Sequence, residues 1–185
     1  MSEASWPARI GRYEVLGRLG AGGMAEVLLC RLAGQSGFER LVTLKRVLPA
    51  LAQQPGFTAM FLDEARIVAS IRHANVVQVF ELLDEGGELC IVMEYLEGES
   101  LASVRSALAG AGRALPPALA CWVVAEAAAG VHAAHQLSGP DGRPLEVVHR
   151  DLSPQNVFVT YDGAVKIIEA VNEAEKLRSM YWHGL

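Results

Sequence analysis

Residues 18–48 read RLGAGGMAEVLLCRLAGQSGFERLVTLKRVL, and most of the expected architecture follows from this pattern. Runs rich in aliphatic and β-branched residues at 13–19, 25–31 and 40–47 are separated by the glycine-rich turns GAGG and GQSG. Short apolar runs of this length, bounded by glycine turns, are typical of consecutive antiparallel strands. The stretch therefore predicts three neighbouring strands of one sheet.

The first of these turns is a candidate phosphate site. Gly20, Gly22 and Gly23 have no side chains that would keep an anion away from backbone N–H groups. A dinucleotide-binding fold would need a helix directly after the glycines, whereas residues 25–31 are strand-like. No Gly-Lys-Ser/Thr sequence follows, as a Walker loop requires. On these residues alone, the turn is either an ordinary glycine turn or the tip of a hairpin that covers phosphates.

Further along the chain, two strands and one helix complete the sheet-rich part. The runs VVQVFELL (76–83) and ELCIVMEY (88–95), joined across DEGG, predict a second hairpin and bring the sheet to five antiparallel strands. Between the third and fourth strands, residues 57–72 predict a single helix. Its apolar residues recur at helical spacing, at Phe57, Met60, Phe61, Val68 and Ile71.

The character of the sequence changes after Gly98, where helical patterns dominate. Residues 100–110 and 116–137 predict two helices, the second opened by prolines, and residues 157–168 predict a hairpin around the turn Tyr-Asp-Gly. The expected fold class is α+β, with a sheet-rich lobe followed by a helix-rich lobe. The expected boundaries are a tail at 1–11, the first lobe at 12–96, the second lobe at 97–168 and a further tail at 169–185.

The composition is that of a soluble globular protein and limits its partners. Of 185 residues, 51% are hydrophobic and 20% are charged, and the formal net charge is -5, so nucleic acid and anionic membranes are not expected partners. Cys30, Cys90 and Cys121 are odd in number and lie in apolar runs, which predicts buried thiols in a reducing, cytoplasmic compartment. Residues 119–135 contain Glu126 and fall short of a membrane span, so we expect a buried helix there and no membrane span.

Two charged residues lie at positions where the pattern expects apolar ones. Glu64 lies three residues after Phe61 and four before Val68, on the apolar face of the expected helix. Period-two alternation puts Lys45 on the same strand face as Leu41, Thr43 and Val47, a largely covered face. Burying either charge alone costs several kcal/mol, and pairing offsets much of that cost. We therefore expect an ion pair between Lys45 and Glu64.

The motifs and their order resemble those of a bacterial, eukaryotic-like (Hanks-type) Ser/Thr protein kinase. Five elements carry the resemblance in family order: the Gly-rich loop Gly20-x-Gly22-x-x-Ala25-x-Val27, the strand Val42-Thr43-Leu44-Lys45, the αC-helix residue Glu64, the hinge MEYLEGESL beginning at Met93, and the catalytic loop His149-Arg150-Asp151-Leu152-x-x-x-Asn156. The resemblance covers residues 12–168 and implies a kinase-like α+β fold, with a five-stranded N-lobe sheet, one αC helix and an incomplete, mainly helical C-lobe.

The resemblance also implies a set of roles in phosphoryl transfer from ATP to protein hydroxyls. Lys45 would hold the α- and β-phosphates, Glu64 would hold Lys45, and Asp151 would orient the substrate hydroxyl. Asn156, with Glu169, would bind Mg²⁺. The residues that would contact ATP are Gly20, Gly22, Gly23, Val27, Thr43, Lys45, Met93, Glu94 and Leu96.

Three departures from the family pattern predict impaired catalysis. Ser153 replaces a lysine that neutralises the γ-phosphate, and Glu169-Ala170-Val171 stands where the family has the Mg²⁺-binding Asp-Phe-Gly. After Ile168 the resemblance ends, and we expect a domain truncated after the catalytic loop. Without later helices, the helix at 117–137 would expose hydrophobic surface.

Three functions are consistent with this sequence. The first is a Ser/Thr protein-kinase-like ATP-binding domain whose partners are ATP and a protein substrate. The second is a pseudokinase that acts as a nucleotide-binding or protein-interaction module. The third is a small-molecule phosphotransferase with the same Asp-x-x-x-x-Asn spacing, which Arg150, the Gly-rich loop and the Met93 hinge disfavour.

Overall fold

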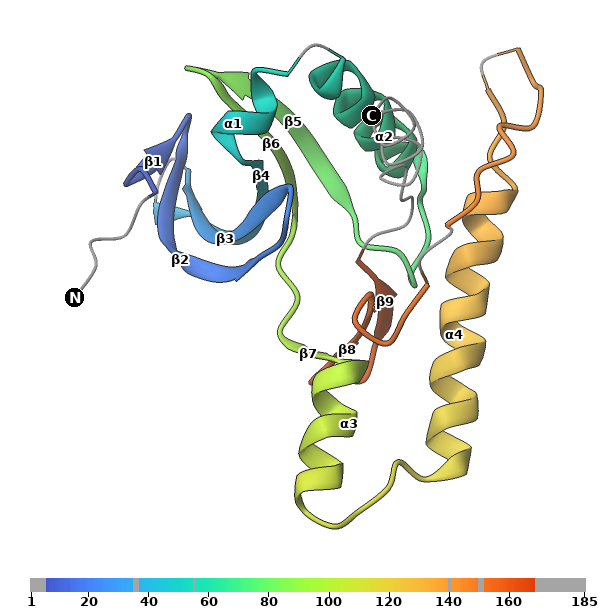
Figure 1. Ribbon diagram of the computed structural model, residues 1–185. Helices are drawn as coiled ribbons and strands as arrows, with labels where there is room; N and C mark the ends of the chain where they lie inside the picture. The colour runs from blue at the N-terminus through green and yellow to red at the C-terminus, as the bar shows by residue number, and fades with distance from the viewer. Residues whose placement is uncertain (1–5, 35–36, 55, 140, 150–151, 169–185) are drawn as a thin grey trace, which may run out of the picture. The chain divides into compact units, whose positions relative to one another are not determined.

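The computed structural model describes residues 6–34, 37–54, 56–139, 141–149 and 152–168, with the backbone alone at Met60 and Glu64 (Figure 1). The chain divides into two compact units. The first comprises Met1–Ala65 and Val79–Tyr95, and the second comprises Arg66–Gln78 and Leu96–Leu185.

The first unit is built on a six-stranded antiparallel sheet with the strand order β1-β2-β3-β4-β6-β5. Its strands are β1 (Arg9–Ile10), β2 (Tyr13–Ala21), β3 (Ala25–Ala33), β4 (Glu39–Val47), β5 (Val79–Glu85) and β6 (Glu88–Glu94). The five predicted strands correspond to β2–β6. The prediction missed β1, which pairs with the start of β2 across a turn at Gly11, where φ is +53°. A two-residue strand is too short to show an alternating pattern.

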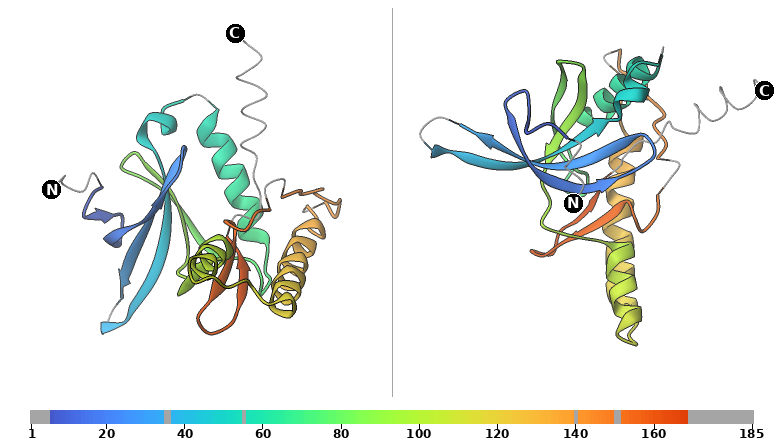
Figure 2. Two further views of the ribbon diagram at one scale, coloured as in Figure 1. Left: turned by 60° about the horizontal axis from the view of Figure 1, so that its bottom comes forward. Right: turned by 60° about the vertical axis from the view of Figure 1, so that its left-hand side comes forward.

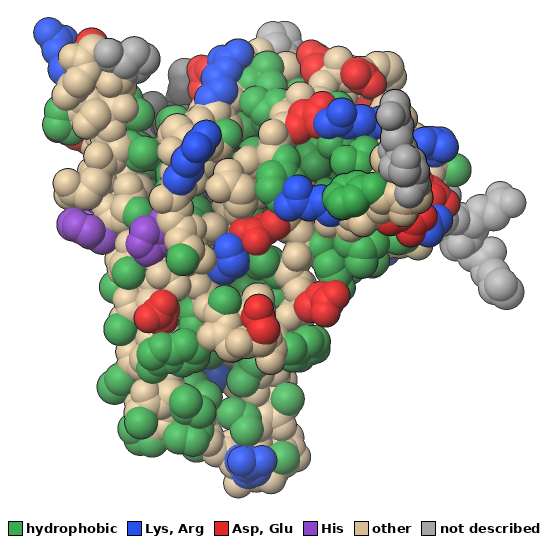
Figure 3. All heavy atoms as spheres, turned by 180° about the vertical axis from the view of Figure 1, so that it is seen from behind, with side chains coloured by type: hydrophobic (Ala, Val, Ile, Leu, Met, Phe, Trp, Pro, Cys, Tyr) green, Lys and Arg blue, Asp and Glu red, His purple; other side chains and the backbone are tan. Residues whose placement is uncertain are grey.

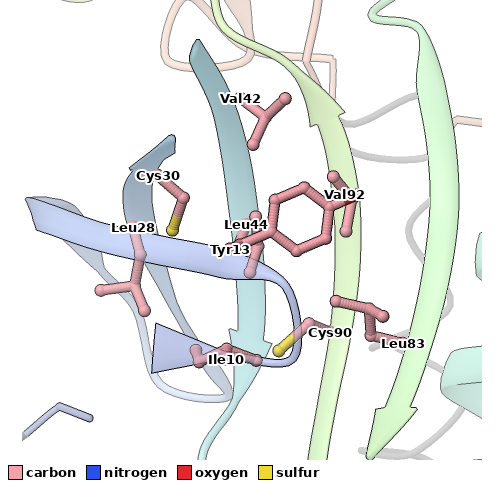
Figure 4. Close-up of a cluster of buried hydrophobic side chains, with 9 residues drawn as sticks. All are labelled: Ile10, Tyr13, Leu28, Cys30, Val42, Leu44, Leu83, Cys90 and Val92. Carbon is pink, nitrogen blue, oxygen red and sulfur yellow. The ribbon is translucent and has the colours of Figure 1, made fainter. Parts of the chain in front are cut away.

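One face of this sheet carries the core of the first unit (Figure 4). Strand alternation places the side chains of β3, β4 and β6 that share this face in one layer, with Tyr13 and Ile10 from the β1–β2 hairpin packed against them. The cluster comprises Ile10, Tyr13, Leu28, Cys30, Val42, Leu44, Leu83, Cys90 and Val92. The sheet is therefore fixed by apolar packing on this face.

Two helices follow β4. The short α1 (Pro49–Ala52) has proline in its first turn, and α2 (Phe57–Ser70) is the helix predicted for 57–72. The rings of Phe57 and Phe61 stack with centroids 6.4 Å apart. Phe57, Phe61, Ala65 and Val68 are buried and recur every three or four residues, so one stripe of α2 faces the protein interior.

The second unit combines two helices with a three-stranded sheet in the order β7-β8-β9 (Figure 2). Its elements are β7 (Gly98–Ser100), α3 (Leu101–Gly110), α4 (Pro117–His135), β8 (Val157–Thr160) and β9 (Val165–Ile167). Ser100 caps α3, because its hydroxyl oxygen accepts a hydrogen bond from the Ser103 amide at 3.0 Å. The hairpin β8–β9 turns at Gly163, where φ is +91°. This hairpin and both helices were predicted from sequence.

Residues 76–78, predicted as the start of a strand, lie outside β5. Val76 forms a parallel bridge with Ile167, the Val77 amide donates to the Ile167 carbonyl at 2.9 Å, and the Ile167 amide donates to the Asn75 carbonyl at 2.8 Å. Since β9 supplies these backbone partners, residues 76–78 belong to the second unit and β5 begins at Val79.

The prediction that α4 is a buried helix is wrong over most of its surface. Only Val123, Ala127, Gly130 and Ala134 of its described residues are buried. Val124 is 64% exposed and Leu119 is 50% exposed, and Figure 3 shows hydrophobic side chains along this part of the surface. By length and composition α4 is the one described helix that could cross a membrane, although core helices of soluble proteins meet the same criterion. The prediction of exposed hydrophobic surface on this helix is confirmed.

One of the three cysteines also differs from prediction. Cys30 and Cys90 are buried as expected, and burial raises the pKa of each thiol to about 12. Cys121 is exposed because it lies on the uncovered side of α4. The apolar sequence around each cysteine therefore predicted burial correctly for Cys30 and Cys90, which lie in strands. It did not do so for Cys121, which lies in a helix.

Candidate functional site

A row of residues across four strands forms the centre of the candidate site in the first unit. Gly20 pairs with Val27, Val27 pairs with Lys45, and Lys45 pairs with Ile91, so β2, β3, β4 and β6 each contribute one member. Cross-strand partners project from the same face of a sheet. The Lys45 side chain therefore shares a face with Val27 and with the residue that begins the glycine turn.

The neighbouring row brings in two more of the predicted cofactor residues. Thr43 pairs with Met93, and both side chains are buried. Thr43 is two residues from Lys45, and Met93 is two residues from Ile91, so they lie on the face that carries Lys45. Glu94 pairs with Val42 and ends β6, whereas Leu96 belongs to the second unit.

The glycine hairpin is closed by backbone contacts. Its last cross-strand pair is Ala21 with Glu26, and the Gly22 amide donates to the Ala25 carbonyl at 2.8 Å. A Cβ built on Gly20 or Gly23 meets nothing within 4 Å, and neither residue has a positive φ. Neither conformation nor packing among the described residues therefore requires glycine at these two positions. Open space beside the backbone is what an anion needs to reach its N–H groups.

Lys45 lies at the centre of the covered part of its strand face. Its side chain is half-buried, and Thr43 and Val47 on the same face are buried, while Leu41 at the strand's start is 40% exposed. Glu64 is part of α2, but its side chain lies outside the described residues. The ion pair between Lys45 and Glu64 therefore stays a prediction.

The second unit positions Asn156 beside the end of the β8–β9 hairpin. Asn156 is buried, its amide donates to the Ser153 carbonyl at 3.0 Å, and the Ile168 amide donates to the Asn156 carbonyl at 3.0 Å. This last bond joins Asn156 to the residue directly before Glu169. Arg150, Asp151, Glu169 and Ala170 lie outside the described residues.

Asn156 and Glu169 have side chains of the kind that bind Mg²⁺. Mg²⁺ takes oxygen ligands from one or two side chains and keeps several water molecules. Asn156 offers an amide oxygen and Glu169 offers a carboxylate. Within the described part of the chain, no group of three or more His, Cys, Asp or Glu side chains could hold a metal ion.

A polar contact network that the sequence analysis did not predict supports this part of the second unit. The buried Asn75 side chain donates to Glu126 Oε2 at 2.7 Å and to the Val165 carbonyl at 2.9 Å. It thereby joins α4 to β9 and provides a partner for the one acidic residue of α4. Gly130 of α4 lies close to the backbone of Asn75. A Cβ added at Gly130 would be only 2.7 Å from the Asn75 carbonyl oxygen.

A second network, in the first unit, was also missed. Arg46 lies on the core face of β4, opposite to Lys45, and forms ion pairs with Glu26 of β3 and Glu88 of β6. Cross-strand register is the signal that could have shown it, because Glu26 pairs with Arg46 and Arg46 pairs with Cys90, two residues from Glu88. That register is not evident from the sequence before the hairpins are aligned.

The second unit also carries a shallow groove beside the segment that follows Asp151. It has a volume of about 740 Å³ and lies along α3. Its lining includes Ser153, Pro154 and Gln155 from one side and Arg105 and Arg113 from the other. The Ala102 amide donates to the Pro154 carbonyl at 2.9 Å, which fixes the start of α3 to this segment.

Comparisons with known proteins agree with the fold and with the motif order. A profile of the protein kinase domain matches residues 13–169. The chain is 46% identical over 160 residues to the tyrosine-protein kinase MasK of Myxococcus xanthus, covering 86% of this chain and 25% of that protein. It is 35% identical over 163 residues to the serine/threonine-protein kinase PksC of Streptomyces coelicolor, covering 86% of this chain and 27% of that protein.

Solved structures give the same result. The crystal structure of the PknI kinase domain of Mycobacterium tuberculosis superposes with a TM-score of 0.66 at 28% identity, covering 87% of this chain and 60% of that chain. The chain thus spans about a quarter of the length of these curated relatives and about three fifths of the solved domain. With the sheet, the glycine hairpin and the motif order all in place, the chain belongs to the protein kinase family.

Proposed function

We propose that the chain binds ATP against the sheet face that carries Lys45 and transfers its γ-phosphoryl group, at a low rate, to Ser or Thr hydroxyls of a protein substrate. One observation carries this proposal: Gly20, Val27 and Lys45 form a continuous row on one face. The backbone of the glycine hairpin and an ammonium thus lie on one face, and groups of these two kinds hold nucleotide phosphates in this family.

The chain's own residues have distinct parts in this proposal. Lys45 would bind the α- and β-phosphates and be held in place by Glu64, while Val27, Thr43, Met93 and the backbone of Glu94 to Leu96 would surround the adenine. Asp151 would orient the attacking hydroxyl. Mg²⁺, held by Asn156 and Glu169, would neutralise phosphate charge.

Two departures from the family pattern support a low rate of phosphoryl transfer. Glu169 stands where relatives of this family have aspartate, and its extra methylene moves the carboxylate by ~1.5 Å. Misplacing a catalytic group by ~1 Å can lower the rate by about 10²-fold. Ser153 also lacks the positive charge that a lysine would bring to the γ-phosphate.

We propose a cytoplasmic location, where ATP is available and thiols stay reduced.

A change at Glu169 tests the proposal for the metal site. Glu169→Asp restores the shorter carboxylate and should raise phosphorylation of a mixed Ser/Thr peptide pool by about 10-fold or more. The measurement is transfer of ³²P from ATP at saturating Mg²⁺. Asp151→Asn is the control, and it should abolish the signal of both forms. Equal rates for Glu169→Asp and the unmodified chain would show that residue 169 does not limit catalysis.

The acceptor class needs its own measurement, because the relatives include a tyrosine-protein kinase as well as serine/threonine-protein kinases. The same assay with three peptides that differ only in a central Ser, Thr or Tyr distinguishes these classes. We expect the Ser and Thr peptides to be labelled. Labelling of the Tyr peptide alone would contradict the proposed acceptor.

A second candidate function is a pseudokinase that serves as a nucleotide-binding or interaction module. The exposed apolar side chains on α4, among them Leu119, Trp122 and Val124, favour it, because contiguous hydrophobic surface marks interaction sites. The pseudokinase function would be supported if the chain binds ATP but shows no phosphorylation that depends on Asp151. The same result would be required of the Glu169→Asp variant.

A further inference from the structure

We infer that Arg46 is a positioning residue for the nucleotide site, acting through a buried charge cluster, Glu26–Arg46–Glu88, on the sheet face opposite to Lys45. The cluster ties the base of the glycine hairpin to the strand that carries Lys45. This inference rests on the proposed ATP site.

The cluster joins three neighbouring strands through one guanidinium. Arg46 lies in β4, which is flanked by β3 and β6 in the sheet. Its Nη1 donates to Glu26 Oε1 at 2.6 Å, and its Nη2 donates to Glu88 Oε1 at 2.7 Å. Its Nε donates to the second oxygen of Glu88, so the pair with Glu88 is bidentate. Planar arginine is suited to this geometry, whereas the point charge of lysine is not.

Two of the three members of the cluster, Arg46 and Glu26, are buried. The side chains of Arg46 and Glu26 are 8% and 6% exposed, and that of Glu88 is 23% exposed. Hydrogen bonds to Glu88 and Glu26 raise the pKa of Arg46. Buried ion pairs are often no more stabilising than apolar residues of similar volume, and some of them serve to select one arrangement. The role of this cluster is therefore to position the groups that it connects.

The first of these groups is Lys45. It precedes Arg46 directly, so their side chains point to opposite faces of β4. Because Arg46 is bonded to both neighbouring strands, β4 cannot shift along β3 or β6 without breaking these bonds. A one-residue shift would exchange the faces of Lys45 and Arg46. The cluster therefore holds the Lys45 ammonium on the face with Val27.

The second group is the glycine hairpin. Glu26 pairs with Ala21, and this is the last pair before the turn that contains Gly22 and Gly23. By holding Glu26, Arg46 fixes the point from which the hairpin extends. The backbone N–H groups of the hairpin and the ammonium of Lys45 are thus positioned relative to each other by a contact on the far face of the sheet.

The test compares Arg46→Lys and Glu88→Gln with a control, Leu83→Ala, which removes core volume from the same unit at a residue that is not a member of the cluster. Isothermal titration calorimetry gives the Kd for ATP, and thermal unfolding gives the loss of stability. We expect both cluster variants to bind ATP about tenfold more weakly. Leu83→Ala should lower the unfolding temperature at least as much and change Kd by less than about twofold.

A second readout does not depend on nucleotide. Amide hydrogen exchange of residues 20–26 should become faster in Arg46→Lys, because lysine lacks the planar fork that bonds Glu26 and Glu88 together, and should not change in Leu83→Ala. If both cluster variants keep the parental Kd and exchange rates, or if Leu83→Ala weakens binding equally, the inference is wrong. If the unmodified chain fails to bind ATP, the proposed function is wrong, and hydrogen exchange alone decides whether the cluster holds the hairpin.

Discussion

Lys45 and Arg46 are consecutive cations whose side chains point to opposite faces of one strand. Period-two alternation was enough to predict the face of Lys45, since that face also carries the buried Thr43 and Val47. It was not enough to predict a buried Arg46, because its partners lie 20 and 42 residues away in sequence. Long-range ion pairs depend on the register of strands, which the sequence pattern alone does not give.

The cysteines provide a test of burial at single residues. Burial raises the pKa of Cys30 and of Cys90 to about 12, so at pH 8 almost none of either thiol is in the reactive thiolate form. Cys121 is exposed on α4. We expect iodoacetamide to add one label to the folded chain at pH 8, at Cys121, as measured by intact-mass and peptide mass spectrometry.

Unfolding the chain in guanidinium is the control for this experiment. All three cysteines should then be labelled, because the two strand thiols lose their burial. Rapid labelling of Cys30 or Cys90 in the folded chain would contradict the described core.

Strands and helices were predicted well where a local pattern was long enough. The strands β2–β6, the helix α2 and the β8–β9 hairpin all have apolar spacing or turn residues that identify them. The short β7 was missed, because its three residues gain strand structure only by pairing with β8. For α4, the sequence predicted exposed hydrophobic surface but not the buried side of the helix, since an all-round apolar sequence does not show which side is covered.

A glycine in α4 tests the packing of that helix. Gly130→Ala should destabilise the chain by about 1–3 kcal/mol, because the new Cβ would lie 2.7 Å from the Asn75 carbonyl oxygen. In an open helical position the same substitution stabilises a helix by up to about 1 kcal/mol. Gly110→Ala at the end of α3 is the matched control, since a Cβ there meets nothing within 4 Å.

Urea denaturation followed by circular dichroism measures both variants. We expect the urea midpoint to fall for Gly130→Ala and to stay level or rise for Gly110→Ala. A rise for both would mean that α4 does not pack closely on the segment containing Asn75.

For the molecule as a whole, the order of motifs carried more information than any one of them. A glycine turn, a half-buried lysine and an Asp-x-x-x-x-Asn spacing each have ordinary structural explanations. Their order along the chain predicted the kinase fold, which the profile match and the PknI structure confirm. The order could not show whether Glu169 supports catalysis, because one methylene at the proposed metal ligand would change the rate without changing the fold.

The proposal that ATP binds on the sheet face with Gly20, Val27 and Lys45 is best tested by isothermal titration of ATP into the chain and into its Lys45→Ala variant. We expect saturable binding by the unmodified chain. We also expect at least about tenfold weaker binding by the variant, since a charge-assisted hydrogen bond contributes about 1.5–3 kcal/mol. Because the Lys45 side chain is only half-buried, the variant should stay folded, as unfolding temperatures will show. No heat of binding at millimolar ATP, or equal affinity of the two proteins, would show that nucleotide does not bind through Lys45.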